Sequence, residues 1–405
     1  MTSPDTRGLW LRLFLPFAAG YFLSYLYRTA NAVIGPVLAR ELDLGDNALG
    51  LLTSTYFLAF GAAQLPLGML LDRFGPRRVE AGLLLLAASG AAVFALSDTL
   101  GGLATGRALI GLGVSACLMA SFKAFSQWFP PERQASLTGW IMASGGLGAL
   151  AASKPLELAL GFASWREIAL GLAATTLLVA GLLWFLVPDK ATGQKGAGFA
   201  EQLAGVKTIF SSRRFWRYAP MGFWFTGGFM AVQGLWASRW MSVLEGMDGA
   251  AIAARLTWIS GAMLAGFLFM GFFATRLVHR GIKLEKIYLG AMIMAISLLA
   301  LISSLPTFAG NLLWPILGIC FSLSNVSYSL VAQSFPPALS GRANTALNLL
   351  VFVGAFGLQW GIGGLVDTLQ ANGWASDAAF RAAFFMLLGG QFLALGWMFL
   401  SGRQR

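Results

Sequence analysis

The chain has 405 residues, of which 57% are hydrophobic and only 11% are charged, whereas ordinary soluble domains have about 25% charged residues. This composition excludes a soluble globular protein and indicates a polytopic membrane protein. The formal net charge of +11 would suit a nucleic-acid partner, but the basic residues lie in loops between long apolar runs. We therefore expect the lipid bilayer, and no nucleic acid, as a partner.

Charge-poor runs long enough to cross a hydrocarbon core of about 30 Å, which takes about 20 residues, recur along the whole sequence. The first run is too long for the hydrophobic region of a signal peptide and has no convincing cleavage site, so we expect it in the mature protein. The expected fold is an all-α membrane protein with twelve transmembrane helices. We place them at residues 13–38, 48–70, 79–97, 102–127, 135–159, 166–187, 217–241, 251–275, 285–304, 309–334, 341–368 and 378–400.

The basic residues are distributed unequally between the loops on the two sides of these helices. If the N-terminus is cytoplasmic, most Lys and Arg residues also fall on the cytoplasmic side. Such a bias follows the positive-inside rule. We expect a multi-pass protein of the cytoplasmic (inner) membrane with both termini in the cytoplasm. The arginines left on the outer side are Arg40, Arg166, Arg239, Arg255 and Arg381.

Two short segments recur about half a chain apart. Gln127-Trp-Phe-Pro-Pro-Glu132 is echoed by Gln333-Ser-Phe-Pro-Pro-Ala338, and Gly68-Met-Leu-Leu-Asp-Arg73 is echoed by Gly271-Phe-Phe-Ala-Thr-Arg276. The longest polar stretch lies between the repeats. We predict an N-terminal six-helix half (1–187), a cytoplasmic linker (188–216) and a C-terminal six-helix half (217–405), with the substrate between the halves.

Two motifs carry a resemblance to a known family. The loop after the second helix reads Gly68-Met-Leu-Leu-Asp72-Arg73-Phe-Gly75-Pro-Arg77-Arg78, and the fourth helix contains Arg107-Ala-Leu-Ile-Gly111-Leu-Gly113. Both resemble motifs of the major facilitator superfamily. The repeat, the twelve helices and the long central loop extend this resemblance over essentially the whole chain, and it implies the fold of that superfamily.

The loop motif, which we call the signature loop, also makes physical sense by itself. Gly68 would allow close approach of two helices. Asp72 and the basic cluster at Arg73, Arg77 and Arg78 can form ion pairs that differ between two arrangements of the halves. We predict a conformational latch here; the alternative is that the arginines only fix the topology. For Arg107, Gly111 and Gly113 the resemblance implies helix packing or conformational coupling.

The sequence has no Gly-x-x-x-x-Gly-Lys-Ser/Thr loop for ATP. The single histidine, His279, excludes histidine-based acid–base chemistry within the membrane. Cys117 and Cys320 fall inside predicted helices, where a small buried residue is the ordinary interpretation. We expect a secondary transporter and not an enzyme, with no cofactor and no metal.

Basic residues, but no acids, lie deep in the predicted helices. Arg28, Arg107, Lys123 and Lys154 fall within the spans, whereas no Asp or Glu lies near the centre of one. A charge at the bilayer centre costs at least ~2.5 to 3.5 kcal/mol, and such residues usually face a bundle interior or an aqueous pathway. We therefore expect a positive cavity, an anionic substrate, and uniport, exchange or proton symport in which the substrate or an outer-end carboxylate such as Glu157 carries the proton. Lys123 and Lys154 could instead extend to the membrane interface.

Arg28 lies about 15 residues into the first helix, too deep to reach either interface. The stretch Tyr25-Leu-Tyr-Arg28-Thr-Ala-Asn31 resembles the first helix of organophosphate/phosphate antiporters, which implies that Arg28 binds the anion. Phe122-Lys123-Ala-Phe-Ser-Gln-Trp128 likewise resembles the end of their fourth helix. Those antiporters have a second substrate arginine on helix seven, but 228–236 carries no charge here. One central arginine fits a monocarboxylate or another small organic anion better than a phosphate ester.

Neutral polar residues on the facing helices could orient such a ligand, although polar residues also hold membrane helices together. The predicted substrate-binding residues are Tyr25, Arg28, Lys123, Gln233, Asn325, Tyr328 and Gln359, with Ser322, Ser324 and Asn348 as further polar candidates and Tyr27 and Trp236 as aromatic ones.

Together these features predict a monomeric secondary transporter that moves a small organic anion across the cytoplasmic membrane by alternating access. Two alternatives stay open: an efflux pump for amphipathic compounds, and a transport-inactive ligand sensor on the same fold.

Overall fold

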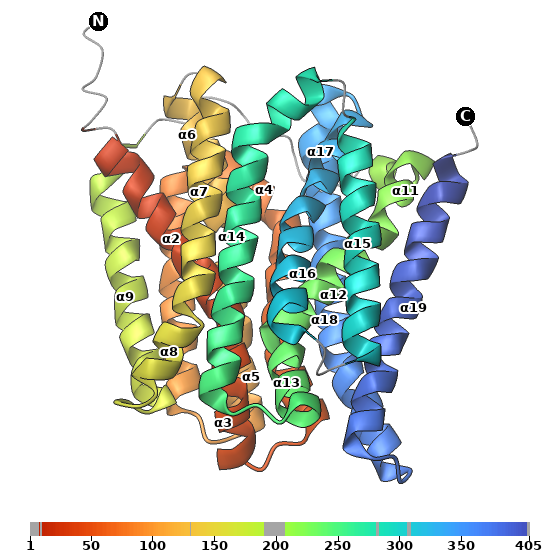
Figure 1. Ribbon diagram of the computed structural model, residues 1–405. Helices are drawn as coiled ribbons and strands as arrows, with labels where there is room; N and C mark the ends of the chain where they lie inside the picture. Colours follow the sequence, from red (N-terminus) through yellow and green to blue (C-terminus); the bar gives the residue numbers. More distant parts are fainter. Residues whose placement is uncertain are drawn as a thin grey trace, which may run out of the picture.

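The computed structural model describes residues 8, 10–129, 131–189, 207–280, 283–305 and 309–402. Every regular element within these ranges is a helix. Eight helices of the described residues are long and apolar enough to cross a membrane. The first, second, fifth and seventh traverses complete the twelve expected from the sequence; the second is the first part of α4, and the other three are each built from more than one helix (Figure 1).

The first half contains six traverses. Its elements are η1 (Trp10–Phe14), α2 (Leu15–Thr29) and α3 (Asn31–Glu41) for the first traverse, α4 (Asp46–Leu96) for the second and third, α5 (Leu100–Gly113) and α6 (Cys117–Trp128) for the fourth, α7 (Pro131–Ala151) and α8 (Lys154–Ala159) for the fifth, and α9 (Trp165–Leu186) for the sixth.

The second half contains the other six. Its elements are α11 (Arg213–Met221), η2 (Gly222–Gly227), α12 (Gly228–Ala231), η3 (Val232–Trp236) and α13 (Ala237–Glu245) for the seventh traverse, then α14 (Gly249–His279), α15 (Leu284–Ser304), α16 (Gly310–Ser324) with α17 (Val326–Gln333), α18 (Pro337–Ala371) and α19 (Ser376–Gly402). Residues 190–206 of the predicted linker 188–216 lie outside the described residues.

Gly75 divides α4 into two traverses. Its φ of 79° lies in the left-handed region, where an L side chain is strained. The second traverse ends there and the third begins, at the position where the sequence places the signature loop. Glycine is therefore required for this sharp change of direction.

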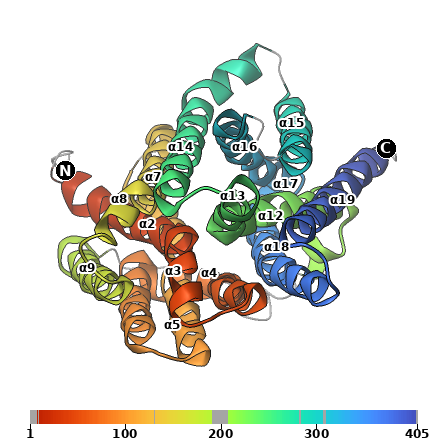
Figure 2. The same ribbon diagram turned by 60° about the horizontal axis from the view of Figure 1, so that its bottom comes forward.

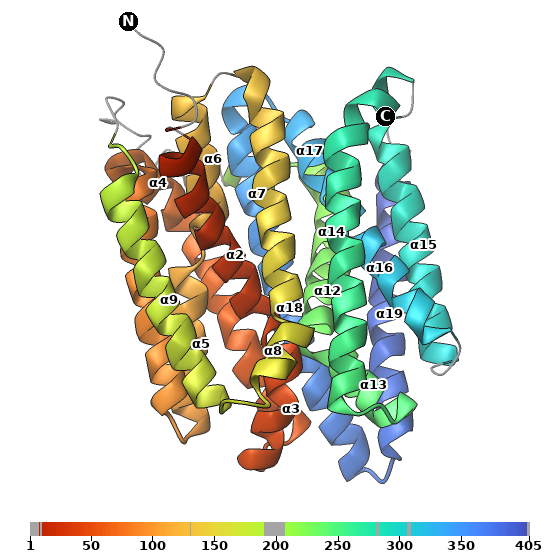
Figure 3. The ribbon, with the colours of Figure 1, turned by 60° about the vertical axis from the view of Figure 1, so that its left-hand side comes forward.

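The helices form two bundles that face one another (Figures 1 and 2). Between the bundles, α4 packs against α18, and α7 packs against α14. The first traverse begins and α19 ends at the same end of the molecule, which we call the termini face; α3 and α13 end at the opposite end, which we call the distal face (Figures 1 and 3). A site between the bundles can therefore communicate with either face, depending on which ends of these helices are in contact.

Candidate functional site

A cavity of about 630 Å³ lies between the two halves. It begins at Arg28 on α2 and continues along Thr138 and Gly139 near the beginning of α7 and along Gly341 and Asn344 near the beginning of α18. Both of these helices begin at the termini face. The cavity therefore extends from the middle of the molecule toward the termini face.

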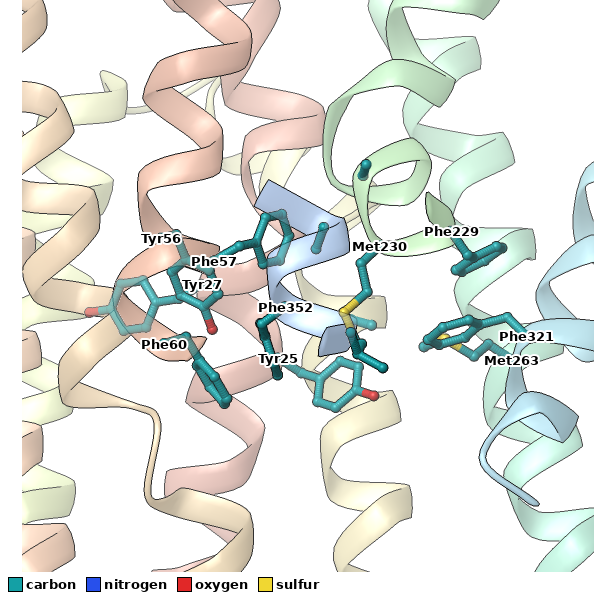
Figure 4. Close-up of a cluster of buried hydrophobic side chains, with 14 of the residues drawn as sticks. Tyr25, Tyr27, Tyr56, Phe57, Phe60, Phe229, Met230, Met263, Phe321 and Phe352 are labelled. Carbon is teal, nitrogen blue, oxygen red and sulfur yellow. The ribbon is translucent and has the colours of Figure 1, made fainter. Parts of the chain in front are cut away.

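Arg28 lies at the inner end of this cavity and is 7% exposed. Its guanidinium carbon is 4.5 Å from the centroid of the Tyr25 ring, 5.4 Å from that of Phe60 and 5.5 Å from that of Phe352. Figure 4 shows these three rings gathered between α2, α4 and α18. Each cation–π contact contributes about 0.5 to 2 kcal/mol. The aromatic rings thus hold the charge in place without neutralising it.

No Asp or Glu of the described residues forms an ion pair with Arg28, and its buried Nε has no hydrogen-bond partner. The hydroxyl of Tyr56, which donates to the Ser24 carbonyl at 3.2 Å, interacts with the guanidinium. A planar fork of N–H donors in a cavity suits a carboxylate, which accepts two parallel hydrogen bonds. Arg28 and Tyr25, which the sequence analysis predicts to bind the substrate, both line the cavity.

Arg107 lies outside the cavity lining, where it joins helices of the same half. Its Nη1 donates to the Tyr27 carbonyl at 3.0 Å, one residue before Arg28, and its guanidinium lies 5.1 Å from the centroid of the Tyr56 ring. Arg107 therefore positions the segment that carries Arg28, and it adds a second positive charge to the electric field there. A Cβ at Gly111 would overlap the Tyr56 carbonyl, and one at Gly113 would overlap Ala87. These glycines allow close helix packing.

The cavity walls are rich in aromatic and methionine side chains. Methionines are flexible and polarizable and adapt to ligands of irregular shape. This apolar lining was not predicted from the sequence, because the chain has 14 Met and 32 Phe and no pattern singles out those that face the cavity. The residues concerned are Tyr21, Phe60, Met119, Met142, Met230, Phe267, Met270, Phe321 and Phe352.

A chain of side-chain hydrogen bonds crosses between the halves at the cavity. Tyr328 donates from its hydroxyl to Asn348 Oδ1 at 2.7 Å, and Asn348 Nδ2 donates to Gln64 Oε1 at 3.1 Å. Asn325 and Ser322 also line the cavity. Tyr328, Asn325, Ser322 and Asn348 were predicted as candidates, whereas Gln64 was not. A glutamine within the apolar run 56–71 is the signal that could have identified it.

Several predicted binding residues do not line the cavity in this conformation. Lys123 is half-buried beside it. Tyr27 forms a hydrogen bond with Thr176 within the first half, and Ser324 forms one with Thr226.

Gln233 and Gln359 are buried on the distal side of Arg28, and neither amide atom of Gln359 has a hydrogen-bond partner among the described residues. Trp236 donates to the Gln359 carbonyl at 3.0 Å. Lys154 is paired with Glu157 at 2.5 Å, near the distal face.

Contacts between the halves close the distal end. Arg239 of α13 pairs with Asp46 at the beginning of α4, with Nη2 and Oδ1 2.6 Å apart. The backbone N–H of Asn47 donates to Asp367 at 2.9 Å, and Trp360 Nε1 donates to Asn47 at 2.6 Å. Each of these bonds joins the first half to the second. The cavity is therefore separated from the distal face.

The arginines of the signature loop contact the end of the first half and the beginning of the linker. Arg78 pairs with Asp189 at 2.7 Å, and Arg77 lies 5.6 Å from the centroid of the Trp184 ring at the end of α9. Arg73 is exposed and lies over Phe74. Gly68 is exposed too. The side chain of Asp72 lies outside the described residues, and the latch stays a prediction.

The structure corrects the expectation that no buried acid is available within the helices. Glu80, the second residue of the predicted span 79–97, is fully buried. The sequence prediction did not consider this residue, which follows the basic pair Arg77-Arg78 by two positions at the beginning of a predicted span. Arg28 and Glu80 are therefore both buried without an oppositely charged partner among the described residues.

The chain matches the Major Facilitator Superfamily over residues 17–358 and belongs to it. It is 26% identical over 189 residues to the hexuronate transporter of Escherichia coli (strain K12), which covers 47% of this chain and 44% of that protein. It is 28% identical over 176 residues to the galacturonate transporter of Dickeya chrysanthemi, which covers 44% of this chain and 51% of that protein. The chain thus spans about half the length of the curated relatives it matches.

The fold is also that of solved structures. A bacterial homologue of the human lysosomal transporter Spinster, in an inward-facing conformation, superimposes with a TM-score of 0.78 at 17% identity, covering 99% of this chain and 98% of that one. At this identity the likeness concerns the fold alone. It agrees with the arrangement of two bundles described above.

Proposed function

We propose that this protein is a secondary transporter that moves a small organic anion across the cytoplasmic membrane by alternating access. The observation that carries the proposal is Arg28: a buried guanidinium at the inner end of a cavity, held by aromatic rings and lacking an acidic partner in the described residues. Intramembrane charges of this kind mark substrate or ion pathways. The substrate carboxylate supplies the negative charge that Arg28 lacks.

The excess of basic residues on one side supports a cytoplasmic position of the termini face. The cavity is then open to the cytoplasm, and the distal contacts Asp46–Arg239 and Asn47–Asp367 close the outer end. Alternating access requires these contacts to break while the helix ends at the termini face come together. This conformation is thus the inward-open state of the cycle.

The cavity lining supports a carboxylate on a compact body. The rings of Phe60 and Phe352 offer apolar faces beside Arg28, and Asn325, Asn348 and Tyr328 offer hydrogen bonds to hydroxyl groups. A sugar acid has all three features: a carboxylate, C–H faces and hydroxyls. The relatives named for hexuronate and galacturonate support this class of substrate.

A second candidate is export of amphipathic compounds. The four methionines of the lining, Met119, Met142, Met230 and Met270, favour it because such side chains repack around varied apolar bodies. Arg28 argues for an anionic amphiphile over a cationic one.

The test is a comparison of ligands on the purified protein. Thermal stabilisation in detergent and substrate counterflow in proteoliposomes would be measured with a hexuronate, an aromatic monocarboxylate, a phosphate ester and a cationic amphiphile. We expect a carboxylate to stabilise the protein and to exchange across the membrane. Exchange of the cationic amphiphile alone would overturn the proposal, and binding of a carboxylate without exchange would favour a sensor.

A further inference from the structure

Glu80 is a buried acid that the anion site does not use. Its side chain is fully buried, and no donor among the described residues makes a standard hydrogen bond to either carboxyl oxygen. The carboxyl group lies against Gly20 of α2, where a Cβ would overlap Oε1. The thiol of Cys117 on α6 lies beside it, with its sulfur 3.8 Å from the same Cβ position. Three traverses therefore enclose Glu80.

An ionised carboxylate in these surroundings would be strongly unfavourable, because burial of an unpaired charge costs several kcal/mol and a thiol is only a weak donor. Protonation removes that cost. An apolar side chain of similar volume would fill this space without the free-energy cost of burying a carboxyl group, so packing alone does not explain an acid at this position. The absence of a side chain at Gly20 gives the carboxyl group the space it needs.

The other titratable groups on the surrounding helices do not neutralise Glu80. On α2, Tyr21 bonds to Met142, and Arg28 lies eight residues beyond Gly20, about 12 Å along the helix. On α4, Arg77 lies over Trp184. On α6, Lys123 lies six residues beyond Cys117. The charged residues of α9, Arg166 and Glu167, are at its distal end. Cys117 is thus the titratable group that touches the acid.

The helices that cover Glu80 also form the cavity wall. Tyr21 and Ser24 of α2 line the cavity next to Gly20, and Leu118 and Met119 line it next to Cys117. The helix of the fourth traverse is interrupted between Gly113 and Cys117, beside the acid. A movement of α2 or α6 that closes the cavity would therefore also change the enclosure of Glu80.

We propose that Glu80 is the binding site for a proton that is transported together with the anion, so that transport is anion–proton symport. The O–H bond of the carboxyl group is intact while the three traverses enclose it. It breaks when water gains access, and the proton passes to that water and leaves a carboxylate. One anion and one proton then cross together without net charge. This inference rests on the proposed function, since it assigns the coupling ion to the same transport cycle.

The test uses Glu80→Gln, which imitates the neutral acid but cannot release a proton. In proteoliposomes with a pH gradient of one unit and no membrane potential, wild-type protein should accumulate the anion up to about tenfold, the ratio that one proton per anion permits. The variant should accumulate none, while its anion counterflow without a pH gradient stays within about twofold of wild type. Glu157→Gln, which removes an acid near the distal face, is the matched control and should accumulate normally.

The outcomes separate the two proposals. The assignment of Glu80 would be overturned if Glu80→Gln accumulated the anion to the wild-type ratio, or if counterflow by the wild-type protein did not change with the pH gradient. Either result would still be compatible with anion transport. Wild-type protein without any counterflow would instead overturn the proposed function. If Glu80→Gln does not fold, Glu80→Asp keeps the acid but draws it away from Gly20 and Cys117. It should shift the pH at which uptake is half-maximal, and an unchanged pH profile would contradict the proposal.

Discussion

The ring of Phe60 on α4 stacks on the ring of Phe352 on α18, with centroids 4.1 Å apart and planes inclined by 19°. The two helices belong to different halves, and Figure 4 shows the two rings next to each other. Both rings also lie over the Arg28 guanidinium. The pair therefore forms the distal end of the cavity and connects the anion site to the closure of the distal face. Opening toward the distal face must separate these rings.

Phe352→Ala is expected to shift the protein toward the distal-open state. An aromatic pair contributes about 0.5 to 1.5 kcal/mol beyond its burial, so the population ratio should change by about two- to twelvefold. Spin labels at Gly101 and Ala375, on distal ends of the two halves, would report longer distances. Phe229→Ala is the control, because Phe229 stacks on Phe321 at 4.1 Å within one half. An equal shift in both variants would contradict a specific role for the inter-half pair.

Asp46→Asn should favour the same opening by removing the ion pair with Arg239. Asp46 is 6% exposed, so the pair is poorly screened, and a differential effect of about 1.4 kcal/mol would change the population ratio tenfold. A membrane-impermeant thiol reagent added from the distal side should modify a cysteine placed at Asn31 faster in the variant. Asp189→Asn, which breaks the exposed pair with Arg78, should leave that rate unchanged.

Asp72→Asn tests the predicted latch on the termini face. If Asp72 pairs across the halves only when that face is closed, removing its charge should leave folding intact and increase the population that is open at the termini face. Labels at Arg12 and Lys283, one on each half, would detect the change as a longer distance. Identical distance distributions in variant and wild type would argue that the signature loop serves topology only.

Gly111→Ala should destabilise the protein, because the new Cβ would overlap the Tyr56 carbonyl and force α5 away from α4. Overpacking of this kind costs about 1 to 3 kcal/mol. Gly82→Ala in the third traverse is the control, since nothing lies within 4 Å of the added Cβ and alanine favours the helix. The measurement is the unfolding temperature in detergent. A Gly111→Ala protein as stable as Gly82→Ala would contradict the close packing.

The sequence predicts the fold and the depth of Arg28 well, because both depend on patterns along the chain. Apolar runs, the half-chain repeat and the basic loops identify the traverses, and Arg28 is far from both ends of the first traverse, although α2 ends one residue after it, at Thr29. The orientation of side chains is harder to predict. Gln233 is the only strongly polar residue of the segment 228–236, so the pattern does not show which way its amide faces; the amide donates to Met263 Sδ, and Gln233 does not line the cavity.

The surroundings of Glu80 and Gln64 could not be predicted from the sequence either, because both depend on contacts with distant parts of the chain. Glu80 follows a basic loop, and only the packing of α2 and α6 over it shows that it is buried. Gln64 gains its significance from Asn348, which is 284 residues away in the chain. Lys123 was expected at the ligand because of its resemblance to the antiporter motif, but the face of α6 that lines the cavity carries Leu118, Met119 and Phe122.

The most direct test of the anion site is counterflow of the exchanging carboxylate by Arg28 variants in proteoliposomes. Arg28→Lys should weaken binding although it keeps the charge, because an ammonium cannot reproduce the planar fork of the guanidinium. Arg28→Gln should nearly abolish exchange with expression largely retained, whereas Lys123→Gln, which alters a basic residue beside the cavity lining, should exchange like wild type. Normal counterflow by Arg28→Gln would contradict the account, since Arg28 would then be structural and the anionic substrate would lose its main support.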